Sequence, residues 1–304
     1  MSLITVFGSI NVDLVARVDT IPRPGETVLA SGYATLCGGK GANQAVAAAR
    51  VSSAGRVVMV GRIGEDAFGG LCMDNLAANG VMVDRVRVGA EPTGCAFITV
   101  SAAGENAITV ASGANASLSV DAIPKAEFSA ATTLVLQMEV PFAASLTVAQ
   151  RVRAKGGRVI WNLAPVPDRL GAAELRALLD ATSVLVVNEH EACAAAARLG
   201  WVGDSFEEAT AFLASTGGVT CIVTAGARGA CAFHPDGARQ AVAADRIRPV
   251  DTTGAGDTFV GILAAGLDEG RDWSEVLARA CRGASLACLE HGAQKGMPTA
   301  EALS

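Results

Sequence analysis

Short apolar runs alternate with helical patterns along most of this 304-residue chain, and that alternation limits the possible folds more than any other feature. The first run, at 3–7, ends at Gly8 and is typical of a buried strand. Further strands are expected at 57–60, 133–137, 158–161, 183–187 and 220–224, with helices at 43–50, 66–79, 143–155, 172–181, 205–215 and 274–288. Strands that are apolar on both faces need helices on both sides. The pattern therefore predicts an α/β fold, a three-layer sandwich with a mostly parallel central sheet flanked by helices.

Two segments, at about 13–37 and 93–110, do not fit this alternation. Both alternate apolar with polar residues and carry turn glycines, which is typical of antiparallel strands with one solvated face. We expect them to form a small antiparallel β lid beside the main sheet. No internal repeat or Pro/Ser-rich linker divides the chain, so residues 1–304 are predicted to form a single domain. Because such a sheet often buries its apolar face against a second subunit, we also expect a homodimer through the lid.

Composition excludes several classes of protein. The net charge is −6 without a basic stripe, and aromatic residues make up only 4% of the chain, which argues against a nucleic-acid partner. The eight cysteines include no C-x-x-C pair and there are only three histidines, so a zinc site of the usual spacing is not expected. No leader pattern and no long apolar run are present, so we expect a cytoplasmic protein with no membrane partner.

The stretch 250–259, Val-Asp-Thr-Thr-Gly-Ala-Gly-Asp-Thr-Phe, stands directly before a helical pattern. Its small residues leave the backbone N–H groups of Gly254, Ala255 and Gly256 open at the positive end of the helix dipole. Such a geometry binds an anion and can stabilise charge on a transferring phosphoryl group. Asp257 lies among these donors and is therefore a candidate functional carboxylate. The alternative interpretation is that Asp257 caps the helix.

A second glycine-rich stretch, 37–44, reads Cys-Gly-Gly-Lys-Gly-Ala-Asn-Gln and also runs into a helix. Lys40 between glycines suggests backbone close to a polar ligand, with Asn43 projecting from the first turn; a solvated turn is the alternative. The stretch is not a Walker A loop, because no Ser or Thr follows the lysine and the required spacing is missing. No strand ends in G-x-G-x-x-G either, which argues against a dinucleotide site.

Polar residues also follow two of the predicted strands. Asn11 and Asp13 come after the first strand and share one face of an extended chain, so they could hold two hydroxyls of a sugar or simply form a turn. Glu139 ends the run at 134–139 and could join the same rim. The carboxyl ends of parallel strands are where open α/β sheets bind their ligands.

Taken together, these motifs resemble a known family. Residues 38–44 and 251–259 are similar to the two signatures of the PfkB, or ribokinase-like, carbohydrate kinases. Supporting stretches follow in the family's order at 8–13, 24–27, 104–106, 113–115, 137–139, 187–191, 224–229 and 292–294. The resemblance covers the chain from residue 8 to about 298, and several motifs in register are far more specific than any one of them.

The resemblance implies a role for each matching residue. Asp257 would be the general base that takes the proton from the sugar's primary hydroxyl as this attacks the γ-phosphate of ATP, and Gly254, Ala255 and Gly256 would form the anion hole. The sugar would be held by Asn11, Asp13, Gly39, Lys40, Asn43, Glu139 and Asp257, with Ala96 and Ile98 closing over it from the lid. The nucleotide would contact Asn188, Thr224, Ala225, Gly226, Ala227, Arg228, Gly229, Gly256 and Cys281.

Two cations are implied as well. Glu191, three residues after Asn188, would help to organise Mg²⁺ through water, although an ordinary helix cap is the alternative for this pair. K⁺ would be bound by Asp251, Thr253 and backbone carbonyls near Ala287, Glu290 and Gly292. Gly296 stands where similar family members have a serine ligand, so K⁺ binding is expected to be weaker or completed by water.

These features predict an ATP-dependent sugar kinase, a phosphotransferase that most closely fits transfer of the γ-phosphate to the 5-hydroxyl of D-ribose. The expected cofactors are ATP, Mg²⁺ and K⁺, and the expected partners are a small sugar and ATP. A kinase of deoxyribose, fructose or a nucleoside remains an alternative, because the shape of the pocket cannot be read from the motifs. A non-catalytic sugar or nucleotide sensor would not need the carboxylate of Asp257, and an NAD-dependent dehydrogenase would need a glycine fingerprint that is missing.

Overall fold

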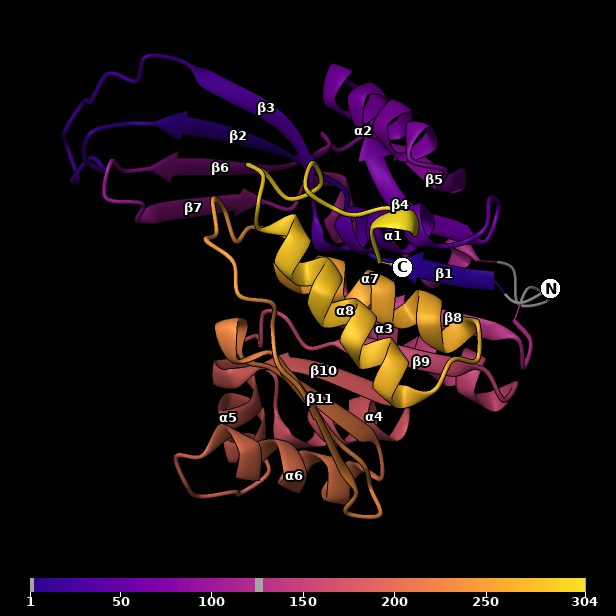
Figure 1. The fold of residues 1–304 in the computed structure, drawn as a ribbon. Coiled ribbons are helices and arrows are strands. Elements are labelled where there is room, and N and C mark those ends of the chain that lie inside the picture. Colours follow the sequence, from indigo (N-terminus) through magenta and orange to yellow (C-terminus); the bar gives the residue numbers. More distant parts are fainter. Residues whose placement is uncertain (1–2, 124–127, 304) are drawn as a thin grey trace.

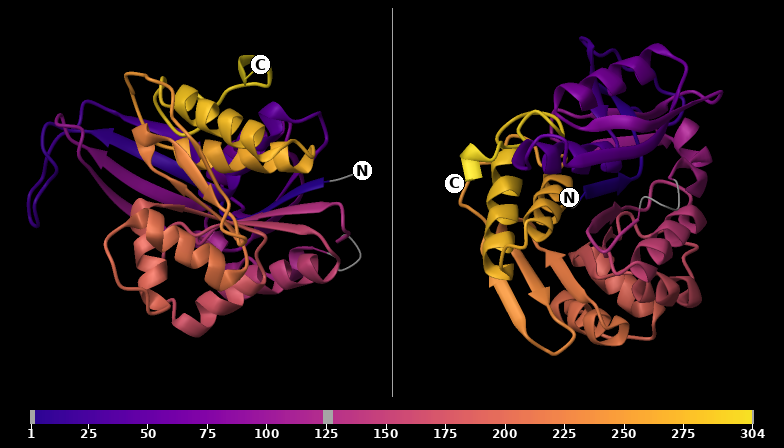
Figure 2. Two further views of the ribbon diagram at one scale, coloured as in Figure 1. Left: turned by 60° about the horizontal axis from the view of Figure 1, so that its bottom comes forward. Right: turned by 90° about the vertical axis from the view of Figure 1, so that its right-hand side faces the viewer.

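The protein is described by a computed structural model that covers residues 3–123 and 128–303. Its main sheet has nine strands, and the helices cover both faces (Figures 1 and 2). In spatial order the strands are β13 (Arg239–Val242), β12 (Ala230–Phe233), β11 (Thr220–Thr224), β10 (Val184–Asn188), β9 (Arg158–Asn162), β8 (Thr132–Leu136), β1 (Leu3–Phe7), β4 (Val57–Gly64) and β5 (Met82–Gly89). The strands from β11 to β5 are parallel, while β12 and β13 are added antiparallel at one edge. The predicted α/β sandwich with a mostly parallel sheet is confirmed.

Two hydrophobic cores form because successive side chains of a strand point to opposite faces of the sheet. On β1, Ile4 and Val6 join one core while Phe7 joins the other. The first core packs against α1 (Lys40–Val51), α2 (Ala67–Ala78), α7 (Ala255–Asp268) and α8 (Trp273–Ala287). The second core packs against α3 (Phe142–Ala154), α4 (Ala172–Asp180), α5 (Glu189–Arg198) and α6 (Phe206–Gly217). The right-hand view of Figure 2 shows these helices on either side of the strands.

A separate four-stranded sheet projects from the side of the main sheet (Figure 1). It consists, in spatial order, of β3 (Tyr33–Gly38), β2 (Asn11–Arg17), β6 (Gly94–Val100) and β7 (Asn106–Ala111). The small sheet expected from the segments 13–37 and 93–110 is therefore present. Its outer pairs, β2 with β3 and β6 with β7, are antiparallel, whereas the central pair β2–β6 is parallel.

Strands at the edges of the main sheet were harder to predict than those at its centre. Strand β5 carries Asp84, Arg85 and Arg87 in its middle, so it lacks the continuous apolar run that marks a central strand. Helix α1 begins at Lys40, three residues before the apolar pattern that predicted it. Among the helices of the described residues, none is long and apolar enough to cross a membrane.

Candidate functional site

The glycine-rich stretch before α7 forms the turn that the sequence predicts. Gly254 is the N-cap of α7 with φ = 76°, a left-handed conformation that favours glycine. A Cβ at this position would also lie 2.6 Å from the carbonyl oxygen of Ala293. Asp257 is the third residue of the helix, directly after Gly254, Ala255 and Gly256; of these three, Ala255 donates its N–H to the carbonyl of Thr252 at 3.2 Å. The stretch thus places a carboxylate beside a helix N-terminus, and the helix N-terminus is the part that favours binding of an anion.

The carboxylate of Asp257 meets the second glycine-rich motif. Asn43 donates from Nδ2 to Oδ2 of Asp257 at 2.9 Å, and Gln44 donates from Nε2 to Oδ1 at 2.9 Å. Both donors lie in the first turns of α1, which packs closely on α7 because Gly261 has no side chain to hold the helices apart. Asp257 is 7% exposed. The two motifs, more than 200 residues apart in the chain, therefore meet in one site, as the resemblance implied.

Gln44 was not among the residues selected from the sequence. It is the last residue of the 38–44 motif and is fully buried. Its position within that motif was the available signal, but the motif did not reveal which side chain its amide would face.

Asp13 stands on β2 with its carboxylate over the backbone of Gly38, where any side chain would collide with it. The pKa of Asp13 is raised from its usual value of 3.8 to about 6, chiefly by burial and then by the charges of Glu139 and Asp257. Asn11 lies two residues earlier on the same face and is held by Asn115, whose Nδ2 donates to Asn11 Oδ1 at 2.7 Å. A half-buried carboxylate that lies near two other carboxylates is costly, so this side chain is arranged for something other than stability.

Lys40 and Glu139 complete a charged cluster around Asp13 and Asp257. The backbone N–H of Lys40 and the hydroxyl of Ser9 both donate to Glu139 Oε2, at 3.1 and 2.6 Å. The pKa of Lys40 is raised above its usual value, chiefly by the charge of Asp257, against the opposing effect of burial. Gly39, the N-cap of α1, precedes Lys40.

The small sheet places Ala96 and Ile98 close to Asp13. In the parallel pair β2–β6, Ala96 is the register partner of Asp13 and Ile98 that of Val15. Partner residues point to the same face of a sheet, so both apolar side chains share the face that carries Asp13. Ala96 is buried and Ile98 is half-buried.

A cavity of about 420 Å³ borders the start of α7. Ala255 and Gly256 line it, and so do residues from the turn between β11 and β12. Of the residues expected to contact a nucleotide, it is lined by Thr224, Gly226, Ala227, Gly229, Gly256 and Cys281. The cavity is lined mostly by apolar surface and includes Ala255 and Gly256 at the start of α7, which suits a flat base with a phosphate chain.

The other three residues expected at the nucleotide, Ala225, Arg228 and Asn188, do not line this cavity. Ala225 lies within the same turn, where its N–H donates to the carbonyl of Gly229 at 2.8 Å. Arg228 points to Glu189 and Glu207 and stacks over the ring of Phe206 at 4.5 Å. Arg228 is thus already engaged by two carboxylates.

Asn188 caps α5 together with Glu191. Asn188 Oδ1 accepts from the N–H of Glu191 at 2.8 Å, and the Glu191 carboxylate accepts from the N–H of Asn188 at 2.8 Å. The cap considered as an alternative from the sequence is therefore present. Burial raises the pKa of Glu191, an effect opposed by the Asn188 hydrogen bond and by the charge of Lys40. Glu191 therefore lies within electrostatic reach of the cluster, so capping and a role at the site are compatible.

Asp251 anchors the segment expected to bind K⁺. Its carboxylate accepts from the N–H groups of Thr253 and Gly292, both at 2.9 Å. Burial alone would raise the pKa of Asp251, but hydrogen bonds from Thr253 and Gly292 hold it below its usual value. These contacts join the two segments from which the oxygen ligands would come, with Ala287 and Glu290 on the second of them.

Gly296 packs directly on the carbonyl group of Ala287, so a Cβ there would collide with the carbonyl oxygen. Within the part of the chain that the structure describes, no three His, Cys, Asp or Glu side chains form a metal-binding cluster. The site expected for K⁺ is of another kind, made of one carboxylate, a threonine and backbone carbonyls, and hard oxygen ligands of this kind suit a K⁺ ion.

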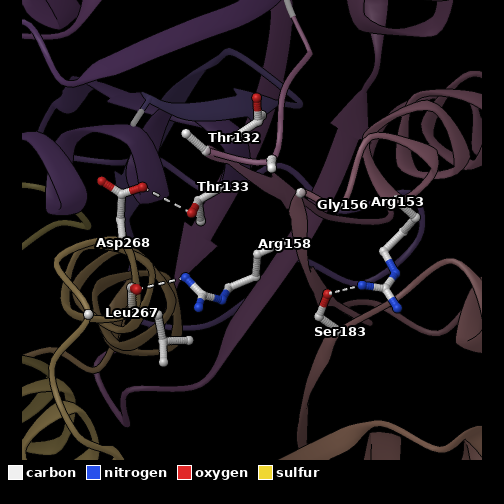
Figure 3. Close-up of a pocket in the computed structure, with 12 residues that line it drawn as sticks. Thr132, Thr133, Arg153, Gly156, Arg158, Ser183, Leu267 and Asp268 are labelled. Carbon is white, nitrogen blue, oxygen red and sulfur yellow. Dashed lines mark hydrogen bonds between the residues drawn. The ribbon is translucent and has the colours of Figure 1, made fainter. Parts of the chain in front are cut away.

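Two further cavities are informative. One, of about 580 Å³, is lined by Asn11 and Glu139 on one side and by Phe142, Pro165 and Leu170 on the other, so it opens beside the charged cluster. The other, of about 410 Å³, lies at the amino ends of the central strands β8 and β9 (Figure 3). There Arg158 donates to the carbonyl of Leu267 at 2.6 Å and Arg153 to the hydroxyl of Ser183 at 3.2 Å. This cavity contains none of the predicted site residues.

Comparison with known proteins shows the family to which the chain belongs. The model of the pfkB family carbohydrate kinases matches residues 1–300. The chain is 37% identical to the ribokinase of Bacillus subtilis (strain 168) over 305 residues, which covers 98% of this chain and 97% of the relative. It is 35% identical to the ribokinase of Lactococcus lactis over 302 residues, covering 98% and 94%.

Solved structures give the same result for the fold. Ribokinase from Thermotoga maritima superposes with a TM-score of 0.90 at 30% identity, covering 100% of this chain and 98% of that one. Ribokinase from Arabidopsis thaliana, solved with ribose and ATP, superposes with a TM-score of 0.86 at 30% identity, covering 99% and 97%. The chain therefore belongs to the pfkB family of carbohydrate kinases.

Proposed function

We propose that this protein is an ATP-dependent kinase that transfers the γ-phosphate of ATP to the 5-hydroxyl of D-ribose. One observation carries the proposal: the carboxylate of Asp257 is held at the N-terminus of α7, beside a cavity of about 420 Å³ and near the charged groups of Asp13 and Lys40. The Arabidopsis relative, solved with ribose and ATP, supports the choice of substrates.

The reaction follows from this arrangement. The 5-hydroxyl of the sugar gives its proton to the carboxylate of Asp257 as its oxygen attacks the γ-phosphorus, and the bond from that phosphorus to the β,γ-bridging oxygen of ATP breaks. The N–H groups of Gly254, Ala255 and Gly256 stabilise the negative charge on the transferring group. ADP leaves with the electron pair of the broken bond.

The sugar is proposed to lie among Asn11, Asp13, Gly39, Lys40, Asn43, Glu139 and Asp257. Carboxylates such as Asp13 and Glu139 accept hydrogen bonds from vicinal hydroxyls, and the nearby charge of Lys40 offsets the negative charge of the group. The small sheet is proposed to act as a lid within one catalytic domain, placing Ala96 and Ile98 over the sugar. Closure would exclude water and so prevent simple hydrolysis of ATP.

The nucleotide is proposed to occupy the 420 Å³ cavity, with its base against Cys281 and its phosphates at Gly256. The turn at 224–229 would form one wall, with Asn188 and Arg228 at its rim. Arg228 would keep its contact with Glu189 while forming that edge.

Mg²⁺ is proposed to be organised by Glu191 through water. One carboxylate fits this ion, because Mg²⁺ at phosphate sites keeps several waters and takes the rest of its ligands from the nucleotide. When bound it would neutralise charge on the β- and γ-phosphates.

K⁺ is proposed to be held by Asp251, Thr253 and the carbonyls of Ala287, Glu290 and Gly292, next to the turn at Gly254. Because Gly296 leaves no room for a side chain against Ala287, we propose that carbonyl groups complete this site without a serine. Titration of turnover with KCl at constant ionic strength tests this proposal. If K⁺ does not change kcat or KM relative to Na⁺ at the same ionic strength, the site is not functional.

A homodimer through the lid is proposed from its exposed apolar residues. Ile108 and Val110 of β7, opposite Ile98 and Ala96, are 53% and 52% exposed. Light scattering tests this proposal: we expect a dimer, converted to a monomer by Ile108→Asp. The eight free cysteines further suggest a reducing, cytoplasmic location.

The experiment that tests the proposed function is an assay of ATP consumption over a panel of sugars and nucleosides, with and without K⁺. We expect D-ribose to give the highest kcat/KM, followed by deoxyribose. If a nucleoside or fructose is preferred by tenfold or more, the assigned substrate is wrong; if no acceptor is phosphorylated, the kinase itself is wrong.

A further inference from the structure

Two series of hydrogen-bonded amide side chains, all buried except the partly buried Asn75, end at Asp257. On one side, Asn75 donates to Gln294 at 2.7 Å, Gln294 donates to Asn43 at 2.9 Å, and Asn43 donates to Asp257 at 2.9 Å. On the other side, Gln137 donates to the side-chain oxygen Oε1 of Gln44 at 2.7 Å, and Gln44 donates to Asp257 at 2.9 Å. These residues come from α1, α2, the end of β8 and the segment after α8.

Every amide in the two series donates towards the carboxylate. An ionised carboxylate only accepts hydrogen bonds, so the amides beside it must present their NH₂ groups, and each next amide must follow in the same direction. In Gln44 both N–H groups of the amide are engaged. Its second N–H donates to Asn162 Oδ1 at 3.1 Å while its carbonyl oxygen accepts from Gln137. Gln44 therefore has one orientation, and it offers Asp257 a donor at one fixed point.

Gln44 has no other route to the reaction. It is fully buried, and it lines neither the nucleotide cavity nor the cavity beside Asn11 and Glu139. Asn43 has the same partner but was also assigned to the sugar, so its two roles cannot be separated by substitution. Gln44 isolates the effect of holding the carboxylate.

We propose that Gln44, fixed by Gln137 and Asn162, is a positioning residue that sets the direction of the Asp257 carboxylate. This inference rests on the proposed role of Asp257 as the base. With one oxygen held by Gln44 and the other by Asn43, the carboxylate cannot rotate about its Cβ–Cγ bond, and it meets the sugar hydroxyl in one orientation. Loss of one of the two donors allows that rotation, and misplacement of a catalytic group by about 1 Å can cost about 10²-fold in rate.

The test is a double-mutant cycle built on Gln44→Met, which keeps the length of the side chain and removes its amide. In the wild-type background we expect kcat with ribose to fall by about 10- to 100-fold, while the KM for ATP stays within about twofold. In an Asp257→Ala background the same change should leave the residual turnover unaltered. A residue that acts only on folding would lower turnover in both backgrounds.

Two further variants keep the test decisive. Gln137→Met, one step farther from the carboxylate, should lower kcat by about 3- to 10-fold and also lose its effect in the Asp257→Ala background. It replaces Gln44→Met in the cycle if that variant does not fold, as judged by circular dichroism. Gln150→Met, an exposed residue of α3, is the control and should leave kcat unchanged.

The outcomes separate this inference from the proposed function. If Asp257→Ala retains turnover, the assignment of the base is wrong. If Asp257→Ala is inactive but the folded Gln44→Met variant keeps kcat within twofold, or lowers turnover equally in both backgrounds, the positioning role is wrong while the proposed function stands.

Discussion

Asp13→Asn should make the ligand-free protein more stable at neutral pH. The pKa of Asp13 rises from 3.8 to about 6 because the ionised form is buried and lies near the charges of Glu139 and Asp257. At 1.36 kcal/mol per pH unit, this rise corresponds to about 3 kcal/mol of lost stability at pH 7. Asparagine has nearly the same shape without the charge, so the variant should recover up to about 3 kcal/mol of the free energy of unfolding.

The pH dependence follows from the direction of this change. A carboxyl whose pKa is raised in the folded state binds its proton more tightly there than in the unfolded chain, so stability falls as pH rises from about 4 to about 6. The advantage of Asp13→Asn should therefore shrink to about 1 kcal/mol at pH 4.5. Urea denaturation followed by circular dichroism, without ligands, measures the free energy of unfolding at both pH values.

A matched control is Asp74→Asn, on the exposed side of α2, which should change stability by less than about 0.5 kcal/mol. In parallel, Asp13→Asn should raise the KM for ribose by roughly 10- to 100-fold, because a charged hydrogen-bond partner of the sugar is lost. Equal stability of wild type and variant at pH 7, or an advantage that does not shrink at pH 4.5, would refute the electrostatic reasoning.

Four other substitutions test the site. Asp257→Asn should lower kcat by about 10²- to 10⁴-fold while ribose binding stays measurable by calorimetry; near-full activity would contradict the assigned base. Gly254→Ala should lower both activity and thermal stability, because φ is +76° and the new Cβ would lie 2.6 Å from the Ala293 carbonyl oxygen. The control is Gly256→Ala, whose Cβ would lie in open space, and this variant should remain folded with an unchanged melting temperature. Glu191→Gln should raise the Mg²⁺ concentration needed for half-maximal turnover, and an unchanged Mg²⁺ dependence would exclude a role for this carboxylate.

Much of the fold follows from local sequence patterns. The central strands, such as β10 and β11, are continuous apolar runs bounded by helices, and a sheet covered on both faces requires that pattern. Strands β5 and β13 were missed because strands at the edge of a sheet need not be apolar on both faces, and β12, which lies beside β13, is only four residues long.

Part of the candidate site could likewise be selected from local sequence patterns, and part could not. Glycine-rich stretches before helices mark an anion site by chemistry that acts over a few residues, so Asp257 and the turn at 254–256 could be selected from the sequence alone. The roles assigned to Asn11, Glu139 and the nucleotide-binding residues depended on the family resemblance, because no local pattern distinguishes them from ordinary turns and caps.

The sequence by itself thus determined the layers of the fold and the two stretches that meet at the site, since backbone propensity and hydrophobic periodicity act between near neighbours in the chain. Only the tertiary structure decided which side chains face Asp257 and how far its neighbours alter the pKa of Asp13. Gln44, Gln137 and Gln294 are ordinary polar residues in the sequence, and they become a directed hydrogen-bond network only when α1, β8 and the segment after α8 come together. Hydrogen bonds and electrostatic interactions depend on distances in space, and those distances are set by packing between elements far apart along the chain.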